Sequence, residues 1–248
     1  MSRHPGIKLF SALLCLAAGA GFVYLITAAL QLEIPSAANY TARAVAETGS
    51  INVPTAILMD YRGFDTLGEA SVIFTSVAVV LVILGAPQFS QPDRIMTLLS
   101  RRAIAYLLPL FFLFPVYVIL NGHLSPGGGF QGGVSLAVLV ILLHVVFGND
   151  FTAQRLPMRL LGITEYLSAL AFASVGLVGI ALGSTYLANA AAGLPLGRPG
   201  ELLSAGIIPL LNVIVGCKVA AGLSSIFYAL AGHTAEDTAE DTATESRQ

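Results

Sequence analysis

Long apolar stretches without charged side chains alternate with short polar segments along this chain. The first stretch, Leu9–Leu32, has 24 residues without Asp, Glu, Lys or Arg. Such a run is long enough for the roughly 20 residues that cross a bilayer as a helix, and it exceeds the apolar part of a signal peptide, about 7 to 15 residues. We therefore predict a first membrane-spanning helix here and not a cleaved signal peptide.

The second charge-free stretch, 70–92, contains many β-branched residues over 71–84, a composition that would indicate a buried strand in water. In lipid, a single segment satisfies its backbone hydrogen bonds only as a helix, so the same run predicts a helix. The next stretch, 103–149, has 47 residues and no Asp, Glu, Lys or Arg. That length is enough for two crossings, separated by the glycine-rich segment 121–129.

Two further stretches hold one charged residue each: Glu165 lies within 160–183 and Lys218 within 202–235. The whole pattern predicts an all-α, polytopic integral membrane protein with about six transmembrane helices. The expected helices are 8–30, 69–86, 103–121, 130–147, 160–183 and 203–231.

Composition agrees with this fold class and excludes two function classes. Only 10% of the residues are charged and 56% are hydrophobic, whereas about 25% of an ordinary soluble chain is charged. This is too much apolar side chain for a soluble enzyme of the same size. The net charge of −2 and the lack of a basic cluster in the sequence exclude nucleic acid as a partner.

The basic residues predict the orientation, because Lys and Arg in short loops are retained on the cytoplasmic side of a membrane. With the N-terminus inside, eight basic residues fall in inner segments, three in outer segments, and Lys218 within a helix. We therefore expect both termini to lie in the cytoplasm. The three outer residues are Arg43, Arg62 and Arg198.

The most unusual segment of the chain is 125–133, with the sequence SPGGGFQGG. It lacks the Gly-Lys-Ser/Thr ending of a P-loop and follows no soluble strand, so it matches no phosphate-binding fingerprint. We favour a structural turn, in which Pro126 stops the preceding helix and glycines permit positive φ and close helix approach. The alternative is irregular backbone that lines an ion path. The glycines concerned are Gly127, Gly128, Gly129, Gly132 and Gly133.

A second segment, 52–69, ends in a cluster of charges just before the second expected helix: Asp60, Arg62, Asp65 and Glu69. One interpretation is a solvated helix entrance, in which Asp65 or Thr66 caps the helix and Glu69 benefits from the helix dipole. The other is functional. Glu69 would then be a proton or cation ligand at the membrane edge, while Arg62 keeps the neighbouring carboxylates ionised.

Glu165 and Lys218 stand out because a charge at a helix centre in a bilayer costs about 2.5 to 3.5 kcal/mol. We expect them to pair with each other or with groups of a neighbouring subunit, unless Glu165, near its helix start, reaches the interface. Two histidines are weaker candidates. His144 and His123 are each isolated, which favours helix packing or a loop hydrogen bond over ligation.

No Ser-His-Asp, Cys-His or paired-carboxylate arrangement stands out in the sequence, and no metal-ligand spacing is present. Cys15 and Cys217 lie in apolar stretches and are expected to be small buried hydrophobic residues. We therefore expect no catalysis, no cofactor and no metal site in this chain.

The glycine segment 121–133, with the helix before it and the segment 212–222 (NVIVGCKVAAG), resembles the B subunit of Mrp-type multisubunit Na⁺/H⁺ antiporters over residues 100–232. The segment 60–69 (DYRGFDTLGE) and the helix after it resemble the C-terminal end of the large A subunit of these antiporters, which is also found as a small separate subunit in membrane-bound hydrogenases.

The resemblance implies an all-helical accessory subunit of an assembly related to the membrane arm of respiratory complex I, in a bacterial or archaeal cell membrane. Its implied partners are other subunits, the lipid bilayer, and Na⁺ or H⁺. Glu69 is the first ion-path candidate and Lys218 the second, with Asp65, Glu165, Asp60, Arg62 and His144 after them. A hydrogenase or other redox-linked complex is the alternative parent, and a purely structural assembly role is the alternative function.

The two resemblances together imply a fusion. We expect a two-helix module over 1–99, a four-helix module over 100–235, and a disordered acidic tail over 236–248, whose composition contains no large apolar residue.

Overall fold

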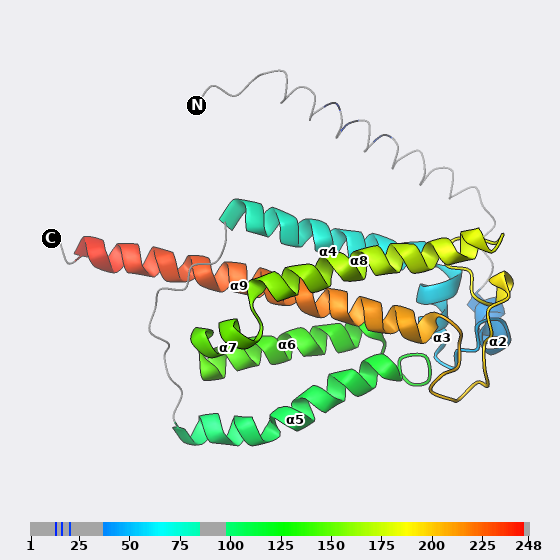
Figure 1. The fold of residues 1–248 in the computed structure, drawn as a ribbon, viewed down its shortest axis with the longest axis horizontal. Coiled ribbons are helices and arrows are strands. Elements are labelled where there is room, and N and C mark those ends of the chain that lie inside the picture. Colours follow the sequence, from blue (N-terminus) through cyan, green and yellow to red (C-terminus); the bar gives the residue numbers. More distant parts are fainter. Residues whose placement is uncertain (1–12, 14–15, 17–19, 21–36, 85–97, 246–248) are drawn as a thin grey trace. The chain divides into compact units, whose positions relative to one another are not determined.

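The computed structural model describes residues 13, 16, 20, 37–84 and 98–245, and these are helical apart from their connecting loops (Figure 1). The chain divides into two units, 1–40 and 41–248, and the elements discussed below belong to the second, apart from residues 37–40 at the start of the first described helix. Within the first expected span, 8–30, only residues 13, 16 and 20 are described, so that prediction lies outside what the structure describes.

Five of the described helices are long and apolar enough to cross a membrane. They are α4 (Gly63–Leu84), α5 (Leu98–Leu120), α6 (Gly129–Phe147), α8 (Met158–Ala181) and α9 (Ile208–Glu245). The all-helical membrane fold predicted from hydropathy is therefore confirmed for the second to sixth expected spans. Shorter helices precede or join them: α2 (Ala37–Thr48), α3 (Val53–Ala56), the π-helical turn η1 (Ile57–Tyr61), α7 (Asn149–Arg155) and the 3₁₀ turn η2 (Ala190–Ala192).

Several element boundaries differ from the sequence prediction, among them those of α4 and α9. Helix α4 begins at Gly63, not at residue 69, because Asp65 and Glu69 lie within its first two turns, where the helix dipole favours acids. Helix α9 begins at Ile208, not at residue 203, and follows two residues with positive φ, Ala205 and Gly206. It also continues to Glu245, into the segment expected to be disordered. The Ala and Glu residues there extend an existing helix without a new nucleation step.

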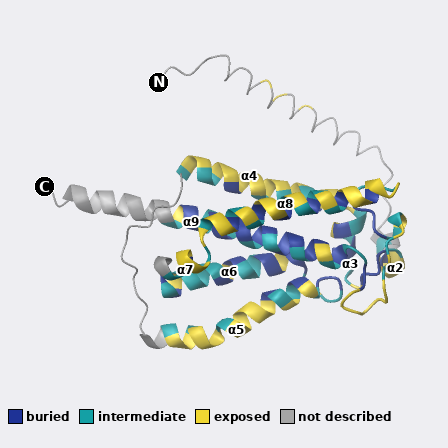
Figure 2. Cartoon of the chain, viewed as in Figure 1, coloured by how far each residue is buried: buried dark blue, intermediate teal, exposed yellow. Residues whose placement is uncertain are grey.

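Helix α9 is the centre of the bundle. It packs against α4, α6 and α8, while α6 also packs against α5. Of the most apolar part of α9, 56% is buried, against 11% for α4 and for α5 (Figure 2). The core combines residues of α9, such as Ile208 and Leu211, with Phe172 of α8 and Leu187 of the following loop. The outer faces of α4 and α5 are consequently apolar and exposed.

Glycines allow α6 to approach its neighbours closely. A Cβ added to Gly133 would lie 2.7 Å from the backbone oxygen of Gly216 in α9, and one added to Gly132 would lie 2.3 Å from Ile119 Cγ1 in α5. Either contact is far inside van der Waals distance. The α6 backbone therefore touches α5 and α9 in a way that no larger residue permits.

Candidate functional site

The glycine segment forms a loop, 121–128, between α5 and α6, and residues of the second unusual segment hold it in place. Asn52 Nδ2 donates to the carbonyl oxygens of Gly122 and Ser125 at 2.7 and 2.8 Å. Thr55 Oγ1 donates to the same Gly122 oxygen at 2.8 Å. The two segments that the sequence singled out separately, about 70 residues apart, are thus joined by direct hydrogen bonds.

The loop needs glycine at its exit, because Gly127 and Gly128 both have φ of +141°. Helix α6 starts immediately afterwards, and its first amide is bound by α9: Gly129 N–H donates to Asn212 Oδ1 at 3.0 Å. Asn212 is fully buried, and its Nδ2 has no hydrogen-bond partner among the residues that the structure describes. Asn212 therefore fixes the start of α6 and keeps an unused donor next to the loop.

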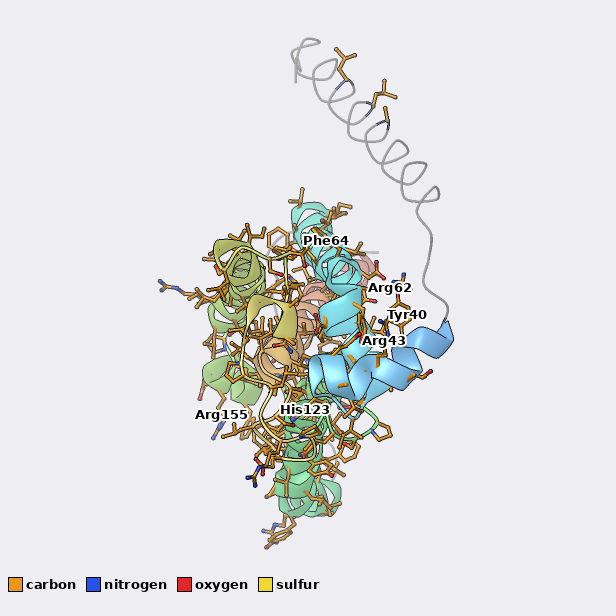
Figure 3. The ribbon with its side chains drawn as sticks, turned by 90° about the vertical axis from the view of Figure 1, so that its right-hand side faces the viewer. Tyr40, Arg43, Arg62, Phe64, His123 and Arg155 are labelled. Carbon is orange, nitrogen blue, oxygen red and sulfur yellow. The ribbon has the colours of Figure 1, made fainter. Side chains whose placement is uncertain are left out.

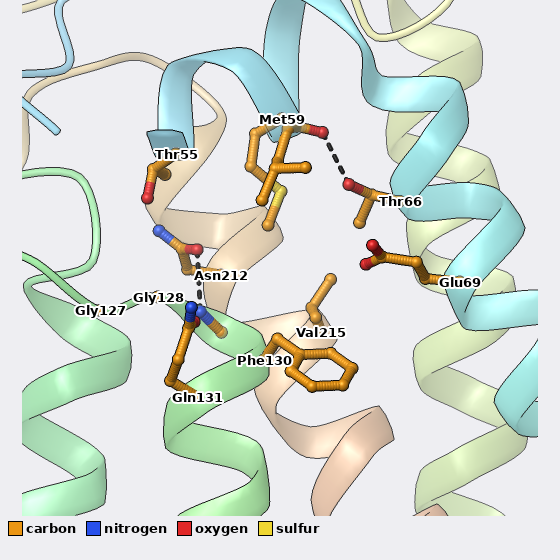
Figure 4. A pocket seen from close by; sticks show the side chains of 12 residues that line it. Thr55, Met59, Thr66, Glu69, Gly127, Gly128, Phe130, Gln131, Asn212 and Val215 are labelled. Atoms are coloured by element: carbon orange, nitrogen blue, oxygen red, sulfur yellow. Dashed lines mark hydrogen bonds between the residues drawn. The ribbon is translucent and has the colours of Figure 1, made fainter. Parts of the chain in front are cut away.

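A cavity of about 170 Å³ lies beside this loop, between α3, η1, α4, α6 and α9. Figure 4 shows the Glu69 side chain directed toward it from α4. The other polar groups that line it are the side chains of Thr55, Thr66, Gln131 and Asn212 and the backbone of Gly127–Gly129. The cavity therefore combines one carboxylate with hydroxyl, amide and main-chain groups, at the end of three transmembrane helices.

The sequence did not single out Asn52, Thr55, Thr66, Gln131 or Asn212 as members of a site. Thr66 was considered only as a helix cap, and that prediction is wrong for Thr66 and for Asp65, since α4 begins at Gly63. The Thr66 hydroxyl instead donates to the carbonyl of Leu58, at 2.7 Å, and so braces η1 against α4. A polar residue within an apolar stretch was the available signal for Asn212.

The remaining charges of the 60–69 segment lie outside the cavity lining. Arg62 pairs with Asp65 at 2.6 Å, but both side chains are largely exposed, so the pair contributes little to stability. Asp60 in η1 is partly buried, and burial together with the nearby Glu47 carboxylate raises its pKa to about 6. Tyr61 donates its hydroxyl to Glu47, which also pairs with Arg43 at 3.2 Å.

The two isolated membrane charges are brought together. Lys218 Nζ of α9 lies 3.7 Å from Glu165 Oε1 of α8, and each side chain is only 2% exposed. Of the alternatives drawn from the sequence, the mutual pair is the one observed, and the expectation that Glu165 reaches the interface is wrong. Neither Lys218 Nζ nor Glu165 Oε1 has a hydrogen-bond partner within the described part of the chain. The Lys218 ammonium also lies 5.2 Å from the ring centre of Phe74 in α4, a cation–π distance.

Neither histidine lines the Glu69 cavity, although His123 belongs to the loop beside it. His144, near the end of α6, has its Nδ1 at 3.3 Å from Thr152 Oγ1 and edge-on contacts with the rings of Phe227 and Tyr228. His123 is buried in the loop, and burial lowers its pKa. Its carbonyl accepts the backbone N–H groups of Ile51 and Asn52, both at 3.0 Å. In the described residues no three His, Cys, Asp or Glu side chains gather where they could hold a metal ion.

Two family models match this chain. A domain described as related to the MnhB subunit of Na⁺/H⁺ antiporter matches residues 99–225, and a family described as the E subunit of MBH matches residues 8–92.

Two individual relatives are similar to much of this chain. The uncharacterized protein MJ1307 of Methanocaldococcus jannaschii is 33% identical over 202 residues, which cover 72% of this chain and 76% of that protein. A probable A/B subunit of a K⁺/H⁺ antiporter from Rhizobium meliloti is 27% identical over 63% of this chain, but the match covers only 19% of that longer protein.

Solved structures share the fold. A chain of the membrane-bound sulfane sulfur reductase (MBS), an archaeal respiratory membrane complex, superposes with a TM-score of 0.67 at 28% identity, covering 90% of this chain and 98% of that one. A chain of the Mrp complex from Dietzia sp. superposes with a TM-score of 0.63 at 22% identity, covering 94% of this chain and 27% of that one.

Proposed function

Because the chain belongs to the family of domains related to the MnhB subunit of Na⁺/H⁺ antiporters, we propose that it is a membrane subunit of a multisubunit cation/proton antiporter. Its partners are then the other subunits of that complex, and the exposed apolar faces of α4 and α5 lie against them or against lipid. The chain itself carries out no catalysis in this proposal.

One observation carries the proposed role of this subunit: Glu69 faces the cavity that joins the glycine loop to α9. Cations such as Na⁺ are bound by oxygen atoms of carboxylates, carbonyls and hydroxyls, and the lining of this cavity supplies all three types. Irregular backbone at membrane depth is tolerated where it lines such a cavity. Glu69 thus binds the translocated cation or proton as it enters or leaves the membrane.

The buried pair of Lys218 and Glu165 has an electrostatic role in this proposal. It lies within the membrane-spanning parts of α8 and α9, where the low dielectric makes charges act on each other strongly. A change in the charge of this pair therefore alters the energy of an ion nearby. The electric field at the entrance to the Glu69 cavity is set by the nearby charges of Asp60, Arg62 and Asp65. His144 packs against the rings of Phe227 and Tyr228.

The proposed orientation places the Glu69 cavity at the outer side of the membrane and both termini in the cytoplasm. Figure 3 looks onto the cavity end, where Arg43 and Arg62 are labelled. The opposite end carries the basic residues Arg101, Arg102, Arg155 and Arg159, in agreement with the positive-inside rule. Reporter fusions in the loops near Arg43 and Asp150 test this, and reporters on the same side would contradict it.

The experiment that tests the role of Glu69 is its replacement by Gln in the intact complex. Transport is followed in membrane vesicles by the collapse of a pH gradient on addition of Na⁺, K⁺ or Li⁺. We expect Glu69→Gln to lower the rate at least about tenfold, as loss of a carboxylate ligand would. Glu201→Gln, at an exposed acid of the outer loop, is the matched control. Normal transport in an assembled Glu69→Gln complex would overturn the assignment.

A second parent complex is favoured by a specific observation, the likeness to the MBS chain at 28% identity over 98% of its length, together with the match to the E subunit of MBH. In that case the chain belongs to the membrane arm of a redox-linked ion pump. Two cysteines in the sequence are too few to hold an iron–sulfur cluster, so redox centres would lie in other subunits. Purification of the native complex and identification of its subunits distinguishes the two parents.

The fusion remains part of the proposal. Residues 1–99 supply the module similar to the end of the large antiporter subunit, 100–235 the B-subunit module, and 236–248 an acidic extension.

A further inference from the structure

A second cavity lies between α4, α8 and α9, and its lining residues all differ from those of the Glu69 cavity. Its volume is about 180 Å³. Small and hydroxyl-bearing residues form much of its wall, and a buried lysine forms part of its lining. The residues that matter here are Ala70, Ser71, Phe74, Thr75, Ala169 and Lys218.

The lysine in this cavity lacks hydrogen bonds. An ammonium group has three protons to donate, yet Lys218 Nζ is without a hydrogen-bond partner among the described residues, and Glu165 Oε1 at 3.7 Å is too far for a direct bond. Burying an ion pair without such bonds is costly, because the lost hydration of both charges is not replaced. The geometry therefore calls for acceptor groups beside Lys218, within this cavity.

The cavity has room for water, and three side chains in its otherwise apolar lining are polar: Ser71, Thr75 and Lys218. Its volume of about 180 Å³ is well above the roughly 10–15 Å³ of cavity volume that one water molecule needs. The hydroxyls of Ser71 and Thr75 donate to carbonyls of their own helix, both at 2.8 Å. Their oxygens keep acceptor lone pairs, with which water in the cavity forms hydrogen bonds.

The charge in the cavity selects against metal cations. Lys218 is the charged residue in its lining, where the corresponding residue in the Glu69 cavity is a carboxylate. Glu165 is paired with Lys218 but is not in the lining, so the ion pair presents its positive end to the cavity, and this end repels Na⁺ or K⁺ in a medium of low dielectric. It does not prevent proton transfer, since the Lys218 ammonium gives one proton to water and the neutral amine that remains takes up another proton from water.

We propose that the cavity between α4, α8 and α9 is a water-filled proton passage to the Lys218–Glu165 pair, closed to metal cations. This inference rests on the proposed function and assigns the two ions to separate places: protons reach Lys218, and the metal cation reaches Glu69.

Cysteine accessibility in the intact complex tests the inference. In a background where Cys15 and Cys217 are replaced by Ser, Ala169→Cys places a thiol in the cavity lining, and Leu170→Cys places one on the next residue, which is 65% exposed on the outer face of α8. Methanethiosulfonates react with the thiolate, which forms only where water is present. We expect residue 169 to be modified at least about tenfold faster than residue 170. Equal rates, or no reaction at residue 169, would overturn the passage.

The sign of the charge in the cavity is tested with two reagents of similar size, the 2-sulfonatoethyl and 2-aminoethyl methanethiosulfonates. Each reagent's rate at residue 169 is divided by its rate with a free thiol in solution. The ratio of the anionic to the cationic value should exceed one, and Lys218→Met should lower this ratio about tenfold. Addition of Na⁺ at constant ionic strength should leave the rates unchanged. An advantage of the cationic reagent, or protection by Na⁺, would overturn the exclusion of metal cations.

Two safeguards keep the result decisive. If Ala169→Cys does not assemble, Thr75→Cys places the thiol on the opposite wall, and if Lys218→Met does not assemble, the ratio with Lys218 in place decides alone. Labelling is measured without transport, so the proposed passage and the proposed function are tested independently of each other. If Glu69→Gln transports normally and residue 169 is labelled fast, only the proposed role of Glu69 is contradicted. If Glu69→Gln is inactive and residue 169 is labelled slowly, only the proposed passage is contradicted.

Discussion

Asn212 of α9 accepts the backbone N–H of Gly129, the first residue of α6, at 3.0 Å. Two transmembrane helices are thereby joined at the point where the glycine loop ends. A Cβ on Gly129 would lie 2.3 Å from the backbone oxygen of the same Asn212. The bond and the close approach depend on each other. They hold the glycine loop, the start of α6 and the start of α9 together as one corner of the bundle beside Glu69.

Replacing Asn212 by Ala should weaken this corner. The change leaves a buried N–H without its acceptor, which costs about 1–3 kcal/mol. We expect a lower melting temperature of the purified complex and reduced transport. Asn121→Ala is the matched control, because among the described residues the Asn121 side chain donates an exposed hydrogen bond to the Tyr117 carbonyl, one turn before it, and joins no second helix. An Asn212→Ala complex as stable as the Asn121→Ala complex would contradict the structural role.

Gly133→Ala should separate α6 from α9. Its new methyl group would meet Gly216 O at 2.7 Å and Val219 Cβ at 2.8 Å, and such overpacking costs about 1–3 kcal/mol. Gly68→Ala in α4 is the control, since a Cβ there meets nothing within 4 Å and alanine favours a helix. Thermal unfolding in detergent should show a loss for the first variant alone, and equal melting temperatures would refute the steric argument.

These glycine contacts illustrate what hydropathy could and could not predict. Stretches without charge located the second to sixth membrane helices, because lipid requires every backbone group to be satisfied within the helix. The charged residues led to a wrong helix start: Asp65 was placed before the helix and Glu69 at its first residue, although α4 begins at Gly63 and helix starts favour acids. The cost of isolated membrane charges gave the pairing of Lys218 with Glu165 as one of several alternatives. The partners of the loop, Asn52, Thr55 and Asn212, were not found, because such contacts depend on packing between distant segments.

Asp60 should make the stability of the complex depend on pH. Its pKa is raised from 3.8 to about 6, so the folded protein binds a proton that the unfolded chain has already released between these values. The free energy of unfolding therefore falls as pH rises from about 4 to about 6 and stays lower above that. Asp60→Asn removes this contribution.

The measurement is the difference in melting temperature between the parent and Asp60→Asn complexes at pH 5 and pH 8. The parent should lose more stability than the variant on going to pH 8. Asp65→Asn is the control, since Asp65 is an exposed acid paired with Arg62. A difference that does not change with pH would show that Asp60 titrates normally.

The Lys218–Glu165 pair allows a structural role to be separated from a role in transport. Removing one partner, as in Lys218→Met or Glu165→Gln, leaves its neighbour buried without a counter-charge, which costs about 3–5 kcal/mol. We expect these single variants to assemble poorly on native gels. The double variant, Lys218→Met with Glu165→Leu, has no charge at these two positions and fills a similar volume. It should recover assembly, because replacing a whole buried pair by apolar residues is often neutral.

The transport rate of the double variant then distinguishes the two roles. If the pair only holds α8 against α9, the double variant transports ions normally. If the charges take part in proton movement, as proposed, it assembles but transports at a rate reduced at least about tenfold, and restored transport would contradict that role.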